Sequence, residues 1–133
     1  MRALDKQKYR KCDKFGCGFY GASRGTRKHK GIDLISIDGE KVYSPIDGKV
    51  TKLGYCYADD LSFRYVEISN KKHVVRLLYV QPSIPINAEL CAGDTIGSAQ
   101  SLQNRYPGIT PHIHAEVKEF GDEINPETLF KED

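Results

Sequence analysis

The residues with the clearest chemical potential are three histidines and an aspartate in two short segments. His29 and Asp33 belong to the sequence His-Lys-Gly-Ile-Asp, and His112 and His114 flank one isoleucine. Imidazole nitrogens and carboxylate oxygens are zinc ligands, and a zinc ion with three protein ligands keeps a fourth position for water or a partner's group. The two segments therefore offer three candidate zinc ligands and one further histidine.

The spacing of these residues favours strands and loops over a helix. Side chains two residues apart on a strand point to the same face, so His112 and His114 can reach one site. The i, i+4 pair of a helical H-E-x-x-H motif is absent. The first segment is expected to be a loop leading into a strand over 32–37, with Gly31 letting the backbone turn both side chains inward. Either pair alone is a weak signal, and the inference depends on both.

The rest of the chain has the pattern of a β protein. Runs rich in β-branched and aromatic residues are bounded by Asp-Gly, Pro and Asn turn signals, and they cover residues 41–44, 48–53, 65–68 and 74–80. We expect a mostly β fold, a compact antiparallel sandwich or half-barrel with little helix. Residues 94–103 are expected to hold one short helical turn, and residues 125–130 a final one with Pro126 at its first position.

Length and charge limit the possible classes of protein. A chain of 133 residues fits a single domain, 1–133. Residues 1–30 hold ten Lys or Arg and two Asp, and we expect residues 1–10 to form a flexible basic arm, partly a cloning artefact. Such a segment could bind sulfated glycan or an acidic protein face, or simply be solvated. Nucleic-acid binding is not expected, and no apolar run approaches the ~20 residues of a membrane span.

Four cysteines leave several states open. Cys12 and Cys17 lie across a short glycine-containing loop and would form a small disulfide ring in an oxidising compartment. Cys56 and Cys91 would then pair if the fold brings them together. The alternatives are four reduced thiols or thiols that bind the metal, but no second close pair of cysteines completes a four-sulfur zinc cage.

The motifs occur in an order that resembles a known family. The segments 29–34, 42–50, 93–97 and 111–117 are similar to those of the lysostaphin/LytM-type zinc peptidases, which cut peptidoglycan cross-bridges. This resemblance covers about residues 27 to 118. The segments 11–18 and 102–109 resemble a narrower group, the leukocyte cell-derived chemotaxin 2 family of secreted animal signalling proteins on the same scaffold. The resemblance to these proteins implies a fold of the lysostaphin/LytM type, also called the duplicated hybrid motif.

The resemblance also implies roles for individual residues. His29, Asp33 and His114 would bind Zn²⁺, and His112 would lie beside the open coordination position. Two neutral imidazoles and one carboxylate leave a positive centre that can polarise a carbonyl and lower the pKa of bound water. His112 could then move a proton or stabilise an oxyanion.

One position departs from the peptidase pattern. The peptidases have a further histidine in a Tyr-x-His-Leu segment, and the corresponding residues here, 79–82, carry Gln81 in its place. Glutamine does not accept a proton at neutral pH, and losing a general acid or base typically costs ~10²–10⁴ in rate. We expect His73 to be solvated in a turn rather than to replace the missing catalytic histidine. The chemotaxin lineage also lacks this histidine, whereas Cys56 and Cys91 have no counterparts there.

Two functions therefore remain. The first is a secreted, zinc-binding signalling or chemotactic protein on a degenerate metallopeptidase scaffold, its signal peptide removed, that binds a cell-surface receptor, another protein or matrix. The second is an active zinc metalloendopeptidase that cleaves glycine-rich or peptidoglycan cross-bridge peptides, with His112 as its only proton-handling residue. The first hypothesis is favoured, because Gln81 occupies the catalytic histidine position.

Overall fold

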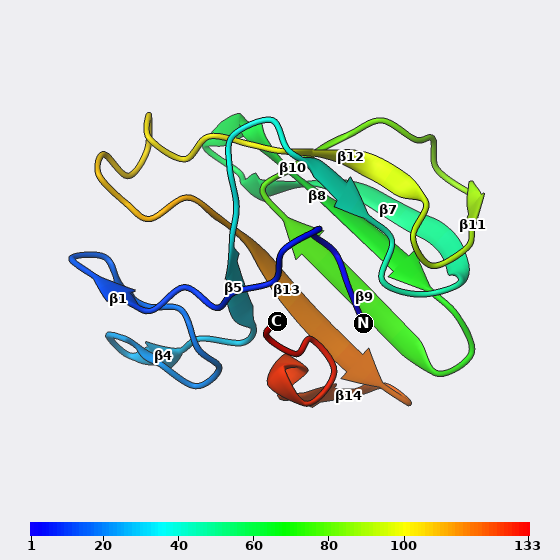
Figure 1. Ribbon diagram of the computed structural model, residues 1–133, viewed down its shortest axis with the longest axis horizontal. Helices are drawn as coiled ribbons and strands as arrows, with labels where there is room; N and C mark the ends of the chain where they lie inside the picture. The colour runs from blue at the N-terminus through cyan, green and yellow to red at the C-terminus, as the bar shows by residue number, and fades with distance from the viewer.

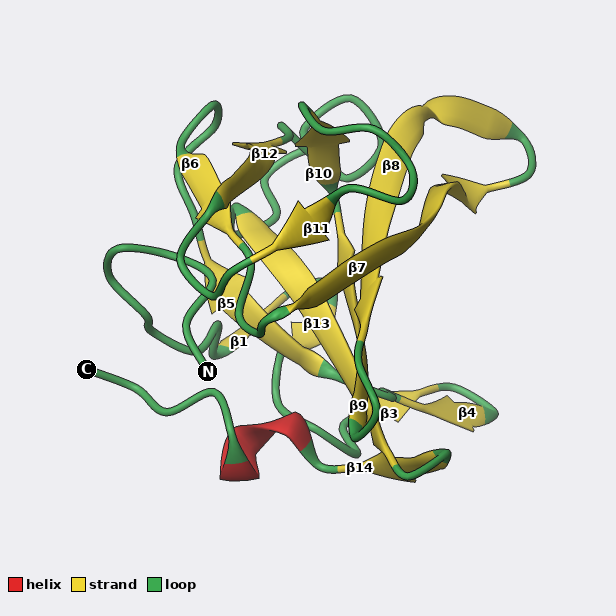
Figure 2. Ribbon diagram, turned by 90° about the vertical axis from the view of Figure 1, so that its right-hand side faces the viewer, coloured by secondary structure: helices red, strands yellow, loops and turns green.

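The computed structural model describes residues 1–133 and consists almost entirely of antiparallel strands (Figure 1). The larger sheet contains, in order, β11 (Glu89–Leu90), β7 (Gly48–Tyr57), β8 (Asp60–Ser69), β9 (His73–Leu78), β13 (His112–Glu119) and β14 (Asp122–Ile124), with β5 (Ile32–Ile35) also paired to β13. The smaller sheet contains β10 (Val80–Pro82), β12 (Thr95–Ala99) and β6 (Lys41–Tyr43). Figure 2 shows the larger sheet curled into an open half-barrel. The expected mostly β half-barrel with little helix is confirmed.

The four expected strand runs lie in β6, β7, β8 and the pair β9 and β10. The run over 74–80 is divided because Tyr79 has a φ of 68°, in the left-handed region. This conformation is costly for a residue with a side chain and persists only where its surroundings hold it. The Tyr79 N–H donates to the Arg64 carbonyl at 2.8 Å, and the Tyr79 carbonyl accepts from the Gln100 N–H at 2.9 Å. The chain therefore leaves the larger sheet at Tyr79 and enters the smaller one.

Strand β13 lies between β9 and β5 and carries the second histidine segment. Ile113, Ala115 and Val117 are buried in the cluster of 18 residues that forms the main core. Because successive side chains on a strand alternate between its faces, His112, His114 and Glu116 project from the opposite face. This alternation separates the core from the candidate site.

The N-terminal segment differs from the expected flexible arm. Ala3 and Leu4 are fully buried in the main core, and the Gln7 side chain accepts from the Ala3 N–H at 2.8 Å. The Asp133 N–H donates to the Gln7 carbonyl at 2.9 Å, so the two ends of the chain lie side by side (Figure 1). The expectation for residues 1–10 was wrong because the apolar pair inserts into the core while the lysines remain at the surface.

The expected helical turn within 94–103 was also wrong, since Thr95–Ala99 forms β12. This strand pairs with β10 on one side and with β6 on the other. Gly97 permits the close pairing, because a Cβ there would lie 2.1 Å from the Gln81 carbonyl oxygen. The final turn was correct: η1 (Pro126–Thr128) is a single 3₁₀ turn capped by Asn125.

Two hairpins project beside β5, namely β1 (Cys12–Asp13) with β2 (Gly16–Cys17) and β3 (Ser23–Arg24) with β4 (Arg27–Lys28) (Figure 1). The Cys12–Cys17 disulfide closes the first hairpin, as expected. Cys56 and Cys91 are free thiols, so the pairing that the sequence left open does not form. Cys56 is half-buried on β7, where burial raises the pKa of its thiol to about 11, whereas Cys91 is exposed beyond β11.

His73 does not lie in a solvated turn. It begins β9, its side chain is only 11% exposed, and its Nε2 lies 3.0 Å from Glu119 Oε1 across the β9–β13 pair. Cross-strand pairing with an acid, rather than solvation, therefore accounts for this histidine.

The structure contains no helix of the length and apolarity that a membrane crossing requires.

Candidate metal centre

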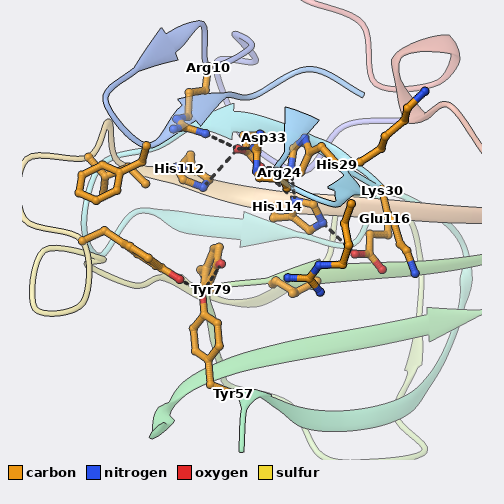
Figure 3. Close-up of a pocket in the computed structure, with 16 residues that line it drawn as sticks. Arg10, Arg24, His29, Lys30, Asp33, Tyr57, Tyr79, His112, His114 and Glu116 are labelled. Carbon is orange, nitrogen blue, oxygen red and sulfur yellow. Dashed lines mark hydrogen bonds and ion pairs between the residues drawn. The ribbon is translucent and has the colours of Figure 1, made fainter. Parts of the chain in front are cut away.

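The three predicted ligands meet in one buried cluster (Figure 3). His114 Nδ1 lies 2.9 Å from His29 Nε2 and 2.9 Å from Asp33 Oδ1, and His29 Nε2 lies 3.2 Å from Asp33 Oδ1. The structure therefore brings all three candidate ligands together from segments more than eighty residues apart.

Strand register brings the three candidate ligands together. His114 on β13 pairs directly with Asp33 on β5, and His29 lies in the loop between β4 and β5, just before Asp33. Gly31 has a different role from the one expected. A Cβ at this position would lie 2.2 Å from the Ala115 carbonyl oxygen and 2.9 Å from the His114 ring, so glycine is required for space rather than for a special backbone conformation.

The outward ring nitrogens of both histidine ligands are engaged by acceptors. His29 Nδ1 donates to the Phe19 carbonyl at 2.9 Å, and His114 Nε2 donates to Glu116 Oε2 at 2.8 Å. Such partners orient metal-binding imidazoles and determine which nitrogen carries the hydrogen. When both rings are neutral, His29 Nε2, His114 Nδ1 and the Asp33 oxygen each present a lone pair to the same point, and no hydrogen lies between them. These three ligand atoms fit a zinc ion, for which the three residues would be the protein ligands.

The same contacts determine the charge states in the metal-free protein. Burial lowers the pKa of His114, but hydrogen bonds and charge from Asp33 and Glu116 outweigh it and raise that pKa to about 9. Burial raises the pKa of Asp33, but the hydrogen bonds from His114 and His29 outweigh it and hold that pKa well below its usual range. A proton thus holds the cluster together without metal, and metal binding must displace it.

Arg10 is a buried member of the site that the sequence analysis missed. Its guanidinium is 2% exposed and donates to Asp33 Oδ2 at 2.8 Å, to Asp13 Oδ1 at 2.7 Å and to the Gly16 carbonyl at 3.0 Å. It therefore connects the disulfide-closed hairpin to a metal ligand. Nothing in the local pattern distinguishes Arg10 from the other basic residues near the N-terminus. Glu116 was also missed, although it stands two residues after His114, within the segment 111–117 that resembles the peptidases.

His112 lies beside the three ligands. Its Nδ1 donates to the Thr110 carbonyl at 2.8 Å, which directs Nε2 to a position 3.4 Å from Asp33 Oδ2. Burial lowers the pKa of His112, so the imidazole is neutral at neutral pH. A neutral imidazole with one free nitrogen can accept a proton from a group in the pocket.

The opposite wall carries phenols. Gln81 is exposed on β10 and does not line the pocket, because the turn at Tyr79 directs the following residues into the smaller sheet. The Tyr79 ring instead packs edge-on against His112, with ring centroids 5.7 Å apart. Its hydroxyl lies 2.7 Å from that of Tyr57 (Figure 3). The Tyr57 hydroxyl in turn lies 2.7 Å from that of Tyr106. Burial raises the pKa of Tyr79 to about 12, so this phenol stays protonated at neutral pH.

The two walls enclose a pocket of about 420 Å³ above the ligand cluster. His29, Asp33, His112 and His114 line one side and the tyrosines the other. The pocket can therefore hold a metal ion together with a bound group, and it presents one neutral imidazole to that group.

Known proteins share both the sequence and the fold. Peptidase family M23 matches residues 27–126, which include all three ligands and His112. Leukocyte cell-derived chemotaxin-2 of Mus musculus is 34% identical over 108 residues, covering 80% of this chain and 71% of that protein. Myeloid protein 1 of Gallus gallus is 36% identical over 111 residues, covering 80% of this chain and 34% of that protein.

The solution structure of lysostaphin superposes with a TM-score of 0.70 at 17% identity, covering 98% of this chain and 54% of that one. At this identity the superposition shows the fold alone. The family match covers three quarters of the residues and every candidate ligand. This chain therefore belongs to peptidase family M23 and is similar, within it, to leukocyte cell-derived chemotaxin-2.

Proposed function

We propose that this chain is a secreted, zinc-binding signalling protein that acts by binding a cell-surface receptor or matrix component rather than by turnover. The similarity to leukocyte cell-derived chemotaxin-2 supports the signalling role. The Cys12–Cys17 disulfide fits an oxidising compartment and thus supports secretion. On this reading the chain uses the M23 fold as a binding scaffold.

The observation that carries the proposal is the difference between ligand groups and proton-transfer groups in the pocket. Three metal ligands converge with their supporting hydrogen bonds in place. Asp33 and Glu116 are already paired with His114, Gln81 lies outside the pocket and Tyr79 is a protonated phenol. His112 is therefore the only group left there to accept a proton. Since general acid–base catalysis contributes typically ~10²–10⁴ in rate, a site with one such group should turn over poorly.

The test combines zinc analysis with a cleavage assay on the same samples. Wild type and His114→Ala are analysed for zinc and incubated with pentaglycine and with bacterial cell wall, with and without chelator. One zinc per chain that is lost in the variant, without cleavage, is the expected result. Chelator-sensitive cleavage by the wild type would overturn the binding-protein proposal.

The metal should also stabilise the fold, because His29 and His114 join distant segments. A bound metal contributes its binding free energy to folding. We therefore expect His29→Ala to lower the melting temperature markedly in zinc, and by less in chelator, where only the hydrogen bonds of His29 are lost. An unchanged melting curve in zinc would contradict a structural role for the ion.

The second candidate function is a zinc metalloendopeptidase acting on glycine-rich or peptidoglycan cross-bridge peptides. The position of His112, held by Thr110 and directed at the ligand cluster, favours it. Cleavage would then disappear both with chelator and in His112→Ala while zinc content in that variant stays near one per chain. No cleavage at high protein concentration would remove this candidate.

A further inference from the structure

The pocket above the metal centre is strongly cationic. Five basic side chains line it, against the two acids Asp33 and Glu116: Arg10, Arg24, Arg27, Lys28 and Lys30. Both acids are already engaged, Asp33 by Arg10 and His114, and Glu116 by His114. Arg27 and Lys28 are exposed and form no ion pair. The lining therefore has positive charge that no group of the protein compensates.

The cationic surface extends beyond this pocket. A second hollow, of about 370 Å³, adjoins the first and shares residues 27–30 with it. Its only acid, Glu123, accepts a hydrogen bond from the Tyr20 hydroxyl at 2.6 Å. A ligand that passes over these shared residues meets basic side chains along its length. This favours an extended anionic chain over a small isolated anion.

The phenolic wall has one hydrogen-bond donor left over. The hydroxyls of Tyr57, Tyr79 and Tyr106 carry three hydrogens, but only two contacts join them. The remaining neighbour, Arg105 Nε, is itself a donor to the Tyr106 oxygen at 3.3 Å. Whichever way the hydroxyls rotate, one phenolic hydrogen has no acceptor in the protein, and a half-buried donor of this kind gains from an acceptor on a ligand. The wall thus suits an oxygen-rich group.

The chemistry of the metal centre narrows the kind of anion. A zinc ion with three protein ligands keeps one position open, and carboxylate oxygens are among its usual ligands. A carboxylate therefore suits the metal, the phenolic donor and the basic rim together. Sulfate oxygens are less basic and therefore weaker zinc ligands, so a sulfate group suits mainly the phenolic donor and the basic side chains.

We propose that the pocket and the adjoining hollow form a binding groove for an acidic peptide segment of a partner protein, with one of its carboxylates placed above His29, Asp33 and His114. Arg27 and Lys28 contact the further acids of the segment. The inference rests on the proposed zinc-binding function and names the ligand class of the same site. It assigns the M23 groove of this chain to the recognition of side-chain carboxylates.

The test is a fluorescence anisotropy titration of the zinc-loaded full chain with a labelled, end-blocked Gly-Glu repeat peptide. The matched probe is the same peptide with glutamine at each glutamate. The acidic peptide should bind and the glutamine peptide should bind about tenfold more weakly or worse, with an affinity that falls as salt is raised. Chelated protein should also bind the acidic peptide more weakly.

Charge reversal locates the surface. Arg27→Glu with Lys28→Glu should weaken binding of the acidic peptide by about tenfold or more, since repulsion replaces attraction. The matched control is Lys41→Glu with Lys49→Glu, two exposed lysines that line neither hollow and form no ion pair. That variant has the same net charge and should bind like wild type. Equal losses of peptide affinity in both variants would show that only the net charge of the protein matters, and would overturn the proposed binding groove.

Other outcomes separate this inference from the proposed function. A heparin-derived tetrasaccharide that binds more tightly than the peptide, and equally well after chelation, would assign the surface to sulfated glycan and overturn the inference. Zinc content and peptide integrity are measured on the same samples. Zinc-loaded, non-cleaving protein without peptide binding would overturn the inference alone, whereas protein that holds no zinc would overturn both.

Discussion

The two walls of the pocket differ in how completely their polar groups are satisfied. On the metal wall, both imidazoles and the Asp33 carboxylate have supporting partners in Phe19, Glu116 and Arg10. On the phenolic wall, three tyrosine hydroxyls share two contacts and one hydrogen remains without an acceptor. The first wall is built to hold a cation, and the second offers donors but no base. The difference fits the proposal that the site binds a metal ion but transfers protons poorly.

The largest expected effect comes from removing the charge at the centre of the metal wall. Asp33→Ala should abolish zinc binding. Because Arg10 keeps Asp13 but loses its charged hydrogen bond to Asp33, the variant should also lower the free energy of unfolding by about 1.5–3 kcal/mol. Urea denaturation in chelator measures the second effect without the metal. Asp38→Ala, at an exposed aspartate, is the control. A stable, zinc-binding Asp33→Ala variant would mean that the metal wall does not depend on this carboxylate.

A smaller effect is expected from the residue behind the ligand. Arg10→Met removes the guanidinium from Asp33 Oδ2 and from Asp13, and outer partners of metal ligands typically contribute about 10–100-fold to metal affinity. Competition titration with a zinc chelator measures the change. Lys11→Met, which alters a side chain that is 76% exposed, should leave the affinity unchanged. If both variants bind zinc alike, Arg10 contributes to packing only.

On the phenolic wall, Tyr57→Phe removes the hydroxyl that takes part in both contacts. Two net hydrogen bonds correspond to about 1–2 kcal/mol of unfolding free energy, and zinc affinity should not change. Tyr55→Phe provides the control, because Tyr55 is on the same strand, is 50% exposed and has no hydroxyl contact in the protein. A loss of zinc affinity in Tyr57→Phe would show that the two walls are coupled.

The smallest effect is expected at the position that the motif comparison singled out. Gln81→His should alter neither zinc content nor cleavage of pentaglycine, because residue 81 is exposed and lies outside the pocket. Tyr79→His, which places an imidazole opposite His112, is the informative partner variant. A gain of chelator-sensitive cleavage in Gln81→His would show that the side chain of residue 81 can reach the pocket.

Much of the candidate site was predictable from local pattern. Alternation along residues 112–117 indicates a strand with one apolar face, and the same alternation places both histidines on the other face. The Cys12–Cys17 disulfide and the turn at Asn125 were also predictable, because each depends on residues within a few positions of one another. The turn expected within 94–103 failed because cross-strand partners on both sides of β12 determine its structure.

The sequence by itself indicated the candidate metal ligands, through the resemblance of their segments to a known family. It also indicated the strand that carries two of the pocket's histidines, since residue type and period-two spacing are local properties. Only the tertiary structure decided that Arg10 holds Asp33, that Ala3 and Leu4 are buried, and that Tyr79 rather than Gln81 faces His112. Each of these depends on contacts between distant segments. The left-handed turn at Tyr79, for example, is held by backbone hydrogen bonds to Arg64 and Gln100, which no pattern within the strand itself records.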